Sequence, residues 1–210
     1  MTLSDHWNTA YTARDEDALT WFEDVPEVSL RLVRNHLPKD GALIDVGGGA
    51  SRLVDHVLMD KPAALTLLDL SAQALAITKA RLGVQAASVT FVAADVRDWA
   101  PDSAYDLWHD RAVFHFLTDP VDQKRYLQTL DASLRPGGVA IISTFDLAGP
   151  ERCSDLPVER YSPQTLAAQI GHLMPDLFDI IHTEHHAHHT PLSNIQTFQF
   201  SVFRKKEPHP

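Results

Sequence analysis

The sequence is poor in cysteine, in basic residues and in long apolar runs. Its single cysteine, Cys153, excludes an intrachain disulfide and fits a reducing compartment. No stretch reaches the ~18 apolar residues that a membrane helix needs, and the polar, acidic N-terminus does not resemble a signal peptide. We therefore expect a soluble, cytoplasmic protein that does not enter a membrane.

Positive charge is scarce: the chain has 18 Lys and Arg against 28 Asp and Glu, a formal net charge of −10 at pH 7. Proteins that follow a phosphate backbone rely on clustered Lys and Arg, so we do not expect nucleic acid as a partner. With 210 residues and no internal repeat, the chain suits one domain over residues 1–210, in which 204–210 have the composition of a frayed tail.

The sequence is organised around residues 42–51. A short apolar run that ends at Asp45 predicts a strand buried on both faces of a parallel sheet. The three glycines Gly47–Gly49 follow, and they allow the backbone to turn sharply and to approach a ligand closely. Ser51 is then expected to cap a helix, because apolar residues recur at helical spacing from Leu53 onward.

Two classes of ligand use such a turn. Dinucleotide sites prefer G-x-G-x-x-G, whose third glycine would fall at Arg52, a poor substitute for close packing of helix on strand. The G-x-G-x-G turn of S-adenosylmethionine sites places its last small residue at Ser51 instead. Asp45 also favours the second class, since a carboxylate repels a pyrophosphate but attracts the ammonium group of a methionine moiety. A tight connection that binds nothing is the structural alternative.

Two later strands bring acidic residues to the same edge. Asp69, twenty positions after Gly49, ends a strand predicted over residues 63–68. A carboxylate at that spacing can accept hydrogen bonds from both ribose hydroxyls, although it could also be a helix-start carboxylate stabilised by the helix dipole. A strand over 88–93 delivers Asp95 to accept the adenine amino group and Val96 to pack on the ring.

Strands alternate with helices along most of the chain. We expect further strands over 105–109 and 139–145, and helices over 28–37, 53–58, 71–82 and 121–134. This alternation predicts an α/β, Rossmann-like, doubly wound parallel sheet whose ligands lie at the carboxyl ends of the strands. After a helix over 163–173, strands over 177–184 and 195–203 are joined by a loop so short that they must pair antiparallel.

With the glycine turn, Asp69, Asp95, the turn over residues 134–138 and the terminal hairpin in this order, the chain resembles the class I S-adenosylmethionine-dependent methyltransferases. The resemblance spans nearly the whole chain and implies a seven-stranded sheet in the order 3-2-1-4-5-7-6 with the last strand antiparallel. It implies S-adenosylmethionine as the cofactor. The residues expected beside the cofactor are Trp7, Tyr11, Trp21, Asp45, Gly47, Gly49, Ser51, Asp69, Leu70, Asp95, Val96 and His109.

The N-terminal segment, residues 1–24, is similar to the lid of methyltransferases related to the eukaryotic elongation-factor lysine methyltransferases. Trp7, Tyr11 and Trp21 stand there among charged residues, and aromatic side chains in a polar segment need a surface to cover. A lid over the cofactor is one interpretation, and a contact with the edge of the sheet is the other.

Methyl transfer requires an aligned acceptor and, where the acceptor carries a proton, a base. We expect the catalytic residues among Asp110 and Arg111, at the end of the fourth strand, and His188. The alternative for Asp110 and Arg111 is a structural ion pair. His188 belongs to a histidine cluster over 182–189, which we interpret as a solvated hairpin loop without a metal. Cys153 is expected as a small apolar filler.

We therefore predict methyl transfer to a small molecule or to a protein side chain. Two alternatives stand beside this prediction. A non-catalytic, S-adenosylmethionine-binding regulatory module is one, because the transfer step needs no invariant catalytic side chain. A nicotinamide-dependent oxidoreductase is the other, although Asp45, Arg52 and the terminal hairpin oppose it.

Overall fold

The computed structural model describes residues 2–207. Its strands are β1 (Ala42–Val46), β2 (Ala64–Asp69), β3 (Thr90–Ala93), β4 (Tyr105–Arg111), β5 (Leu134–Phe145), β6 (Arg152–Cys153), β7 (Leu156–Pro157), β8 (Phe178–His189) and β9 (Ile195–Lys205). Its α-helices are α1 (Leu3–Ala13), α2 (Glu27–His36), α3 (Leu53–Met59), α4 (Ala72–Leu82), α5 (Pro120–Ser133) and α6 (Pro163–Leu173). Short 3₁₀ turns cover Glu16–Ala18, Gly83–Ser88 and Phe114–Phe116.

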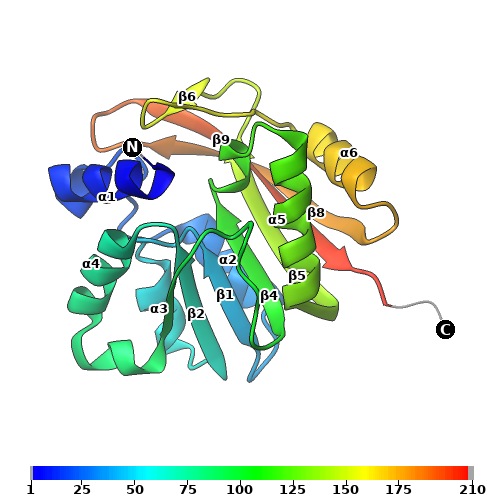
Figure 1. Cartoon of the computed structure of the whole chain (residues 1–210), viewed down its shortest axis with the longest axis horizontal. Helices are drawn as coiled ribbons and strands as arrows, with labels where there is room; N and C mark the ends of the chain where they lie inside the picture. Colours follow the sequence, from blue (N-terminus) through cyan, green and yellow to red (C-terminus); the bar gives the residue numbers. More distant parts are fainter. Residues whose placement is uncertain (1, 208–210) are drawn as a thin grey trace.

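One seven-stranded sheet forms the centre of the molecule, in the order β3-β2-β1-β4-β5-β9-β8 (Figure 1). The strands from β3 to β5 run parallel, whereas β9 is antiparallel to both of its neighbours, β5 and β8. Strands β6 and β7 pair only with each other and lie outside this sheet. Within the sheet, β8 and β9 are therefore the sixth and seventh strands along the chain, and the order is the predicted 3-2-1-4-5-7-6. The predicted fold class is confirmed.

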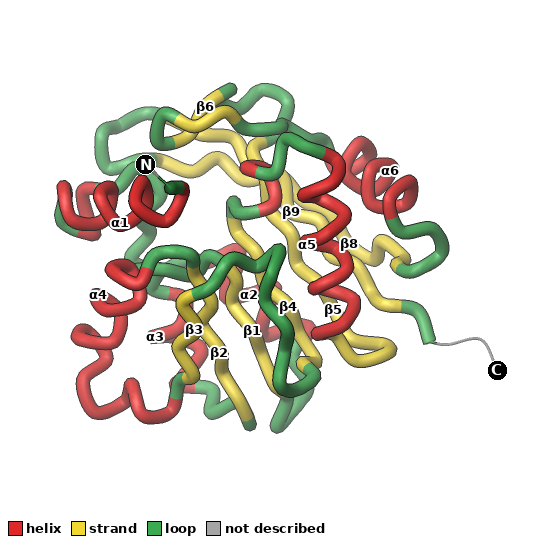
Figure 2. The backbone as a smooth tube through the Cα atoms, in the orientation of Figure 1, coloured by secondary structure: helices red, strands yellow, loops and turns green. Residues whose placement is uncertain are grey.

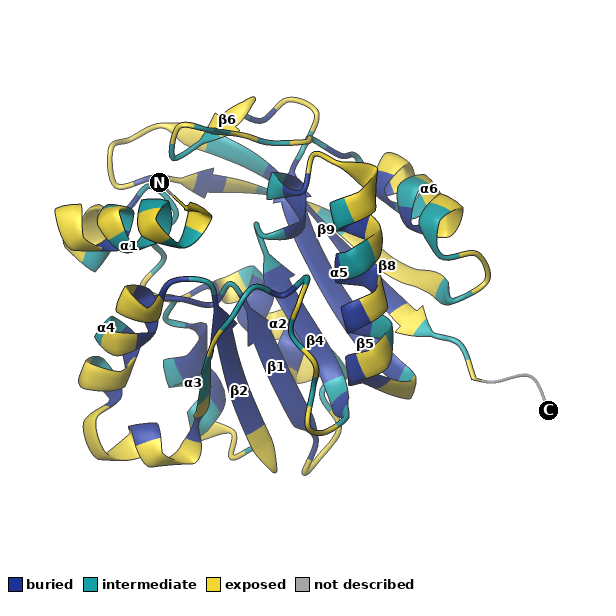
Figure 3. Ribbon diagram, viewed as in Figure 1, coloured by how far each residue is buried: buried dark blue, intermediate teal, exposed yellow. Residues whose placement is uncertain are grey.

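Helices cover both faces of the sheet and divide the core in two. Leu43 of β1 packs in a cluster with α2, α3 and α4, while its neighbour Ile44 packs in a second cluster with α5 and α6. This alternation follows from the period of two along a strand. Figure 2 shows α5 in front of the sheet and α2 behind it. All five residues of β1 are buried, as are most residues of the central strands (Figure 3).

The N-cap residue of one helix is the predicted one, whereas that of another helix differs from the prediction by one residue. Ser71 caps α4 as predicted, because its Oγ accepts a hydrogen bond from the backbone N–H of Ala74 at 3.1 Å. The N-cap of α3 is Arg52, one residue after the predicted Ser51. The Ser51 hydroxyl still accepts from the N–H of Leu53 at 3.2 Å, so it satisfies one of the free donors of that helix.

The C-terminal hairpin is longer than predicted. The pairing of β8 with β9 continues to His189 and Ile195, so the histidines from His182 onward lie in a strand, and the expectation of a solvated loop there is wrong. At the other end β9 includes Lys205, whose Nζ donates to the carbonyls of Asp131 and Leu134. The expected tail therefore begins later than residue 204, and its last residues, 208–210, lie outside the described range.

Within residues 2–207, no helix combines the length and the apolar character that crossing a membrane requires.

Truncating a buried side chain of β1 should greatly lower the stability of the protein. Leu43 is fully buried between two neighbouring strands, so Leu43→Ala should lower the free energy of unfolding by about 2–5 kcal/mol through lost burial and a residual cavity. Met59 is 73% exposed, and Met59→Ala should change stability by less than about 0.5 kcal/mol. Urea denaturation of both variants tests this, and equal midpoints would contradict it.

Candidate functional site

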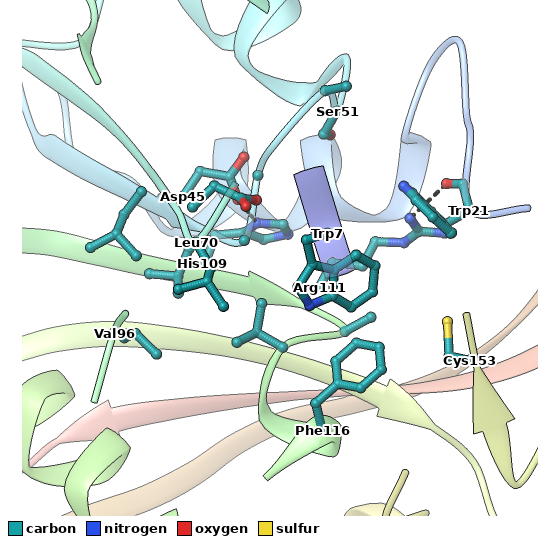
Figure 4. A pocket seen from close by; sticks show the side chains of 18 of the residues that line it. Trp7, Trp21, Asp45, Ser51, Leu70, Val96, His109, Arg111, Phe116 and Cys153 are labelled. Carbon is teal, nitrogen blue, oxygen red and sulfur yellow. Dashed lines mark hydrogen bonds and ion pairs between the residues drawn. The ribbon is translucent and has the colours of Figure 1, made fainter. Parts of the chain in front are cut away.

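A cavity opens at the carboxyl ends of β1, β2 and β4, beneath α1 and the segment that follows it (Figure 4). It encloses about 1370 Å³ including the part open to solvent, which leaves room for a nucleoside-sized cofactor and a second molecule. Of the residues predicted beside the cofactor, those that line it are Trp7, Tyr11, Trp21, Asp45, Gly47, Ser51, Asp69, Leu70, Asp95, Val96 and His109. Gly49 is not among the lining residues, although its neighbours Gly48 and Ala50 are.

The glycine turn holds the backbone close to the cavity walls. Gly47 and Gly49 have φ angles of 67° and 43°, a left-handed region that suits glycine. A Cβ on Gly49 would lie 2.8 Å from the hydroxyl oxygen of Tyr11 and 2.9 Å from Oδ2 of Asp69. A side chain at this position would therefore separate α1 from the end of β2.

Asp45, at the end of β1, presents one free carboxylate oxygen to the cavity. Its Oδ1 lies 2.7 Å from Nδ1 of His109, and Nε2 of that ring lies 2.9 Å from the hydroxyl of Ser29. Oδ2 is buried and has no hydrogen-bond partner among the described residues. A buried acceptor without a partner is costly, and the ammonium group of a methionine moiety would satisfy it. The chemistry of Asp45 thus fits the predicted cofactor.

Asp69 is the second buried carboxylate of the cavity. Burial, with a smaller contribution from the charge of Asp45, raises the pKa of Asp69 to about 7, and the hydrogen bond from the Ser71 N–H opposes this shift. That N–H donates to Oδ1 at 2.7 Å, while Oδ2 faces Gly49 and the cavity. Two buried carboxylates so close together favour a cationic ligand with hydroxyl groups.

Asp95 and Val96 follow β3. Burial would raise the pKa of Asp95, but hydrogen bonds from Arg97 lower it, because the guanidinium engages both carboxylate oxygens at 2.6–2.9 Å. Oδ1 also accepts from the Arg97 backbone N–H at 2.9 Å, so the remaining acceptor capacity lies on Oδ2. Val96 is buried and lines the cavity with an apolar surface. Asp95 and Val96 therefore offer a hydrogen-bond acceptor beside an apolar surface. Their contact with the adenine ring of the cofactor stays a prediction.

The N-terminal segment covers the cavity. The rings of Trp7 and Trp21 are 6.0 Å apart, and Trp7 also meets Phe116 edge-on at 5.1 Å. Helix α1 is attached to α4, since the Asn8 side-chain carbonyl accepts from the Ser71 hydroxyl at 2.8 Å. The aromatic residues thus lie over the cavity rather than on the sheet edge alone. Ordering of this cover on cofactor binding stays a prediction.

Arg111 is the only one of the three predicted catalytic residues that lines the cavity. Its Nη1 donates to the carbonyl of Trp21 at 3.0 Å, and its guanidinium lies 5.0 Å from the centre of the Phe198 ring. Nη2 lies 3.2 Å from Glu23 Oε1 in an ion pair without hydrogen-bond geometry. Nε and Nη2 therefore have no hydrogen-bond partner among the described residues.

Asp110 points away from the cavity. Its carboxylate accepts hydrogen bonds from the N–H groups of Val113 and Phe114, at 2.7 and 3.0 Å, and from the Tyr126 hydroxyl at 2.6 Å. Burial raises the pKa of Asp110 to about 6, which these hydrogen bonds oppose. The structure does not pair Asp110 with Arg111, so the structural alternative that we considered for the two is wrong.

His188 also lies outside the cavity lining, buried under the N-terminal segment. Its Nε2 is 2.8 Å from the carbonyl oxygen of Thr20, and its Nδ1 is 3.0 Å from Glu23 Oε1. Cys153, in contrast, lines the cavity from the small β6–β7 hairpin, and burial raises the pKa of its thiol to about 11. It is therefore an uncharged, partly buried side chain, as predicted.

Sequence reasoning missed several lining residues. They are the aromatic side chains Phe116, Phe145 and Phe198, whereas Glu16, Phe22 and Glu23, which also line the cavity, belong to the predicted lid segment 1–24. Phe145 ends the predicted fifth strand, and its position at a carboxyl end was the signal that could have identified it. Phe116 lies in the turn after β4 and Phe198 in β9, and no local pattern shows that these segments reach the cavity.

We predict that Asp69→Asn weakens S-adenosylmethionine binding about 10- to 100-fold, because charge-assisted hydrogen bonds to ribose contribute about 1.5–3 kcal/mol each. The same variant should be more stable than the parent at pH 8. With a pKa raised from 3.8 to about 7, the folded state holds a proton that the unfolded state releases, so stability falls as pH rises through this window.

Calorimetric titration and thermal unfolding at pH 5 and pH 8 check both parts. Asp60→Asn is the control, because Asp60 pairs with Arg34 on the surface. Unchanged affinity in the Asp69 variant would refute the ribose assignment.

We also predict that Asp110→Asn lowers the free energy of unfolding by about 1–3 kcal/mol, because the amide leaves at least one buried donor without an acceptor. Cofactor affinity should stay within about threefold. Denaturant unfolding and calorimetry measure the two quantities, with the exposed Asp179→Asn as the control. A fully stable but inactive variant would show a direct role in catalysis.

Comparisons with known proteins agree with this geometry. A family model described as a methyltransferase domain matches residues 43–138, from β1 to the turn within β5. A malonyl-[acyl-carrier protein] O-methyltransferase 2 of Ilyobacter polytropus is 26% identical over 104 residues, which cover 49% of this chain and 39% of that protein. The chain thus spans about two fifths of the length of the curated relatives that it matches.

Solved structures extend the similarity to the whole chain. The 1,6-didemethyltoxoflavin-N1-methyltransferase of Burkholderia thailandensis, with bound S-adenosylhomocysteine, is 22% identical with a TM-score of 0.72, covering 97% of this chain and 87% of that one. The N-methyltransferase NodS of Bradyrhizobium japonicum, also with S-adenosylhomocysteine, is 16% identical with a TM-score of 0.69, covering 97% and 100%. In its glycine turn, its paired carboxylates and its strand order, this chain is similar to the class I S-adenosylmethionine-dependent methyltransferases, and residues 43–138 match the methyltransferase-domain model.

Proposed function

We propose that this protein transfers the methyl group of S-adenosylmethionine to a carboxylate of a small molecule or of a carrier-bound acyl group. The observation that carries the acceptor class is Arg111. It is a largely buried guanidinium in the cavity wall, with two nitrogen atoms that have no hydrogen-bond partner among the described residues. Guanidinium groups bind carboxylates through two parallel hydrogen bonds.

The cofactor side of the cavity would be held by the carboxylates. Asp45 would accept from the ammonium group, Asp69 from the ribose hydroxyls, and Asp95 from the adenine amino group. Trp7 and Tyr11 would exclude water above them. When bound, the cofactor supplies an electrophilic methyl group on a sulfonium sulfur. The protein then mainly has to align the acceptor with that methyl group.

The acceptor side of the cavity is aromatic and positively charged. The rings of Phe116, Phe145 and Phe198 line it near Arg111. Since Phe198 lies against the guanidinium and the carbonyl of Trp21 holds Nη1, Arg111 is fixed in place. Its Nε and Nη2 have no hydrogen-bond partner among the described residues, although Nη2 lies 3.2 Å from Glu23 Oε1. In the proposal, Arg111 orients the acceptor carboxylate while the rings hold its apolar part. Asp110 and His188 become positioning residues, which fix the turn after β4 and the N-terminal cover.

The titratable groups support an acceptor that has no proton to lose. His115 does not line the cavity, and burial lowers its pKa to about 3. The Cys153 thiol has a raised pKa, and His109 is engaged by Asp45 and Ser29. An amine or hydroxyl acceptor needs a base, whereas a carboxylate is already anionic at neutral pH.

The names of the curated relatives point the same way. They are described as O-methyltransferases of malonyl-[acyl-carrier protein], and a malonyl group ends in a free carboxylate. An acyl group on a carrier protein is therefore included in the acceptor class. A cytoplasmic location and the exclusion of nucleic acid as an acceptor stay predictions, as does the similarity to elongation-factor lysine methyltransferases.

We predict that Arg111→Gln raises the KM for a carboxylate acceptor about 10- to 100-fold, because it removes charge-assisted hydrogen bonds worth about 1.5–3 kcal/mol. Affinity for S-adenosylmethionine should stay within about threefold. The measurement is formation of S-adenosylhomocysteine with a malonyl thioester and a panel of monocarboxylic acids, amines and phenols. Arg135→Gln is the matched control, since Arg135 pairs with Asp106 at the opposite edge of the sheet.

Turnover of an amine or a phenol that survives in Arg111→Gln would contradict the carboxylate assignment. Tight cofactor binding without any turnover across the panel would instead favour the regulatory module.

A further inference from the structure

At the wall of the cofactor cavity, three side chains converge where the N-terminal cover meets β8. Glu23 comes from the cover, and His186 and His188 come from alternate positions of β8, so their side chains lie on the same face of the strand. Oε1 of Glu23 lies 3.0 Å from Nδ1 of His188 and 3.5 Å from Nε2 of His186. The three potential ligand atoms all lie within 4.8 Å of one another.

The hydrogen bonds of His188 leave a lone pair directed at a carboxylate. Nε2 lies 2.8 Å from the carbonyl oxygen of Thr20, and a carbonyl only accepts, so Nε2 carries the hydrogen. In the neutral ring Nδ1 is then an acceptor, yet it faces Glu23 Oε1 at 3.0 Å. The Arg111 guanidinium lies beside Glu23 but does not bridge the two atoms, and two acceptors at this distance require a proton or a cation between them. A second proton on the ring or a metal ion would supply it.

The geometry favours a metal ion. Two imidazole nitrogens and one carboxylate oxygen form a common donor set for zinc, and at bond lengths of ~2.0–2.1 Å tetrahedral ligands lie about 3.3 Å apart. The observed separations of 3.0 and 3.5 Å fall on either side of that value. Histidines that bind metals usually donate their other N–H to a carbonyl or carboxylate, as His188 does to Thr20.

We propose that Glu23, His186 and His188 bind a divalent transition-metal ion of the zinc class. The His188 side chain is 2% exposed and Glu23 is 17% exposed, so the site is shielded on two sides. His186 is 31% exposed and leaves an approach for the ion and for a water ligand. The ion ties the cover, through Glu23, to the edge strand of the sheet. This site adjoins the proposed acceptor side through the Glu23–Arg111 ion pair, but metal binding does not depend on the identity of the acceptor.

Arg111 opposes a cation at this position, because its Nη2 lies 3.2 Å from the same Oε1. The guanidinium has anchors of its own on Trp21 and Phe198, so Glu23 can exchange this ion pair for the metal while Arg111 stays in place. Removing the charge of Arg111 should therefore strengthen metal binding. A simple ion-pair cluster predicts no such effect.

The test is calorimetric titration of the chelator-treated full chain with Zn²⁺, together with the absorption spectrum of its Co²⁺ complex. His186→Ala and Glu23→Gln should weaken Zn²⁺ binding at least tenfold and abolish the tetrahedral Co²⁺ spectrum. Arg111→Gln should strengthen binding. The matched control is His185→Ala, because His185 is exposed and contacts Asp146. Its Zn²⁺ affinity should stay within threefold of the parent.

Thermal unfolding verifies that each variant is folded before titration. A parent chain that binds Zn²⁺ no more tightly than His186→Ala and Glu23→Gln would overturn the proposal and leave His188 as a protonated partner of Glu23. Loss of binding in His185→Ala to the same extent would likewise assign the ion to other histidines.

Discussion

Two carboxylates buried at the ends of neighbouring strands are the constraint on which the rest of the site depends. Asp45 and Asp69 lie in one cavity, and the charge of the first raises the pKa of the second. Each has one oxygen engaged by the protein, through His109 or the Ser71 N–H, and one directed to the cavity or to its glycine turn. Negative charge is thus held where water is scarce, and a cationic ligand stabilises it. The preference for a cationic cofactor follows from these two carboxylates more than from the shape of the cavity.

The cover over these carboxylates is anchored on both sides of the cavity. On one side α1 bonds to the start of α4 through Asn8, and Glu16 pairs with Arg81 at 2.6 Å. On the other side, Thr20, Trp21 and Glu23 meet His188 and Arg111. The aromatic residues of the cover lie between these two anchors. The second anchor is polar and contains the proposed metal ligands, so its strength depends on solution conditions.

The central part of the site could be predicted because local sequence determines it. A buried strand that ends in a glycine turn brings Asp45 to the edge, and the spacing to Asp69 repeats the arrangement one strand further. The sequence could not show which residues at the end of β4 face the cavity. His109 and Arg111 lie on one face and Asp110 on the other, so either set could have faced the cavity. His188 was misplaced because its environment consists of residues 20–23, far away in the sequence.

The distribution of charge in the cavity also bears on turnover in the proposed reaction. The cofactor side holds carboxylates and the acceptor side holds Arg111, so a cationic donor and an anionic acceptor are each attracted to the side opposite in charge. Transfer of the methyl group removes the sulfonium charge and the carboxylate charge in the same step. The ester product therefore loses the attraction to Arg111, whereas the demethylated cofactor keeps the ammonium group from which Asp45 would accept. Arg111 in this way binds the acid more tightly than the ester, and the same interaction that selects the acceptor favours release of the product.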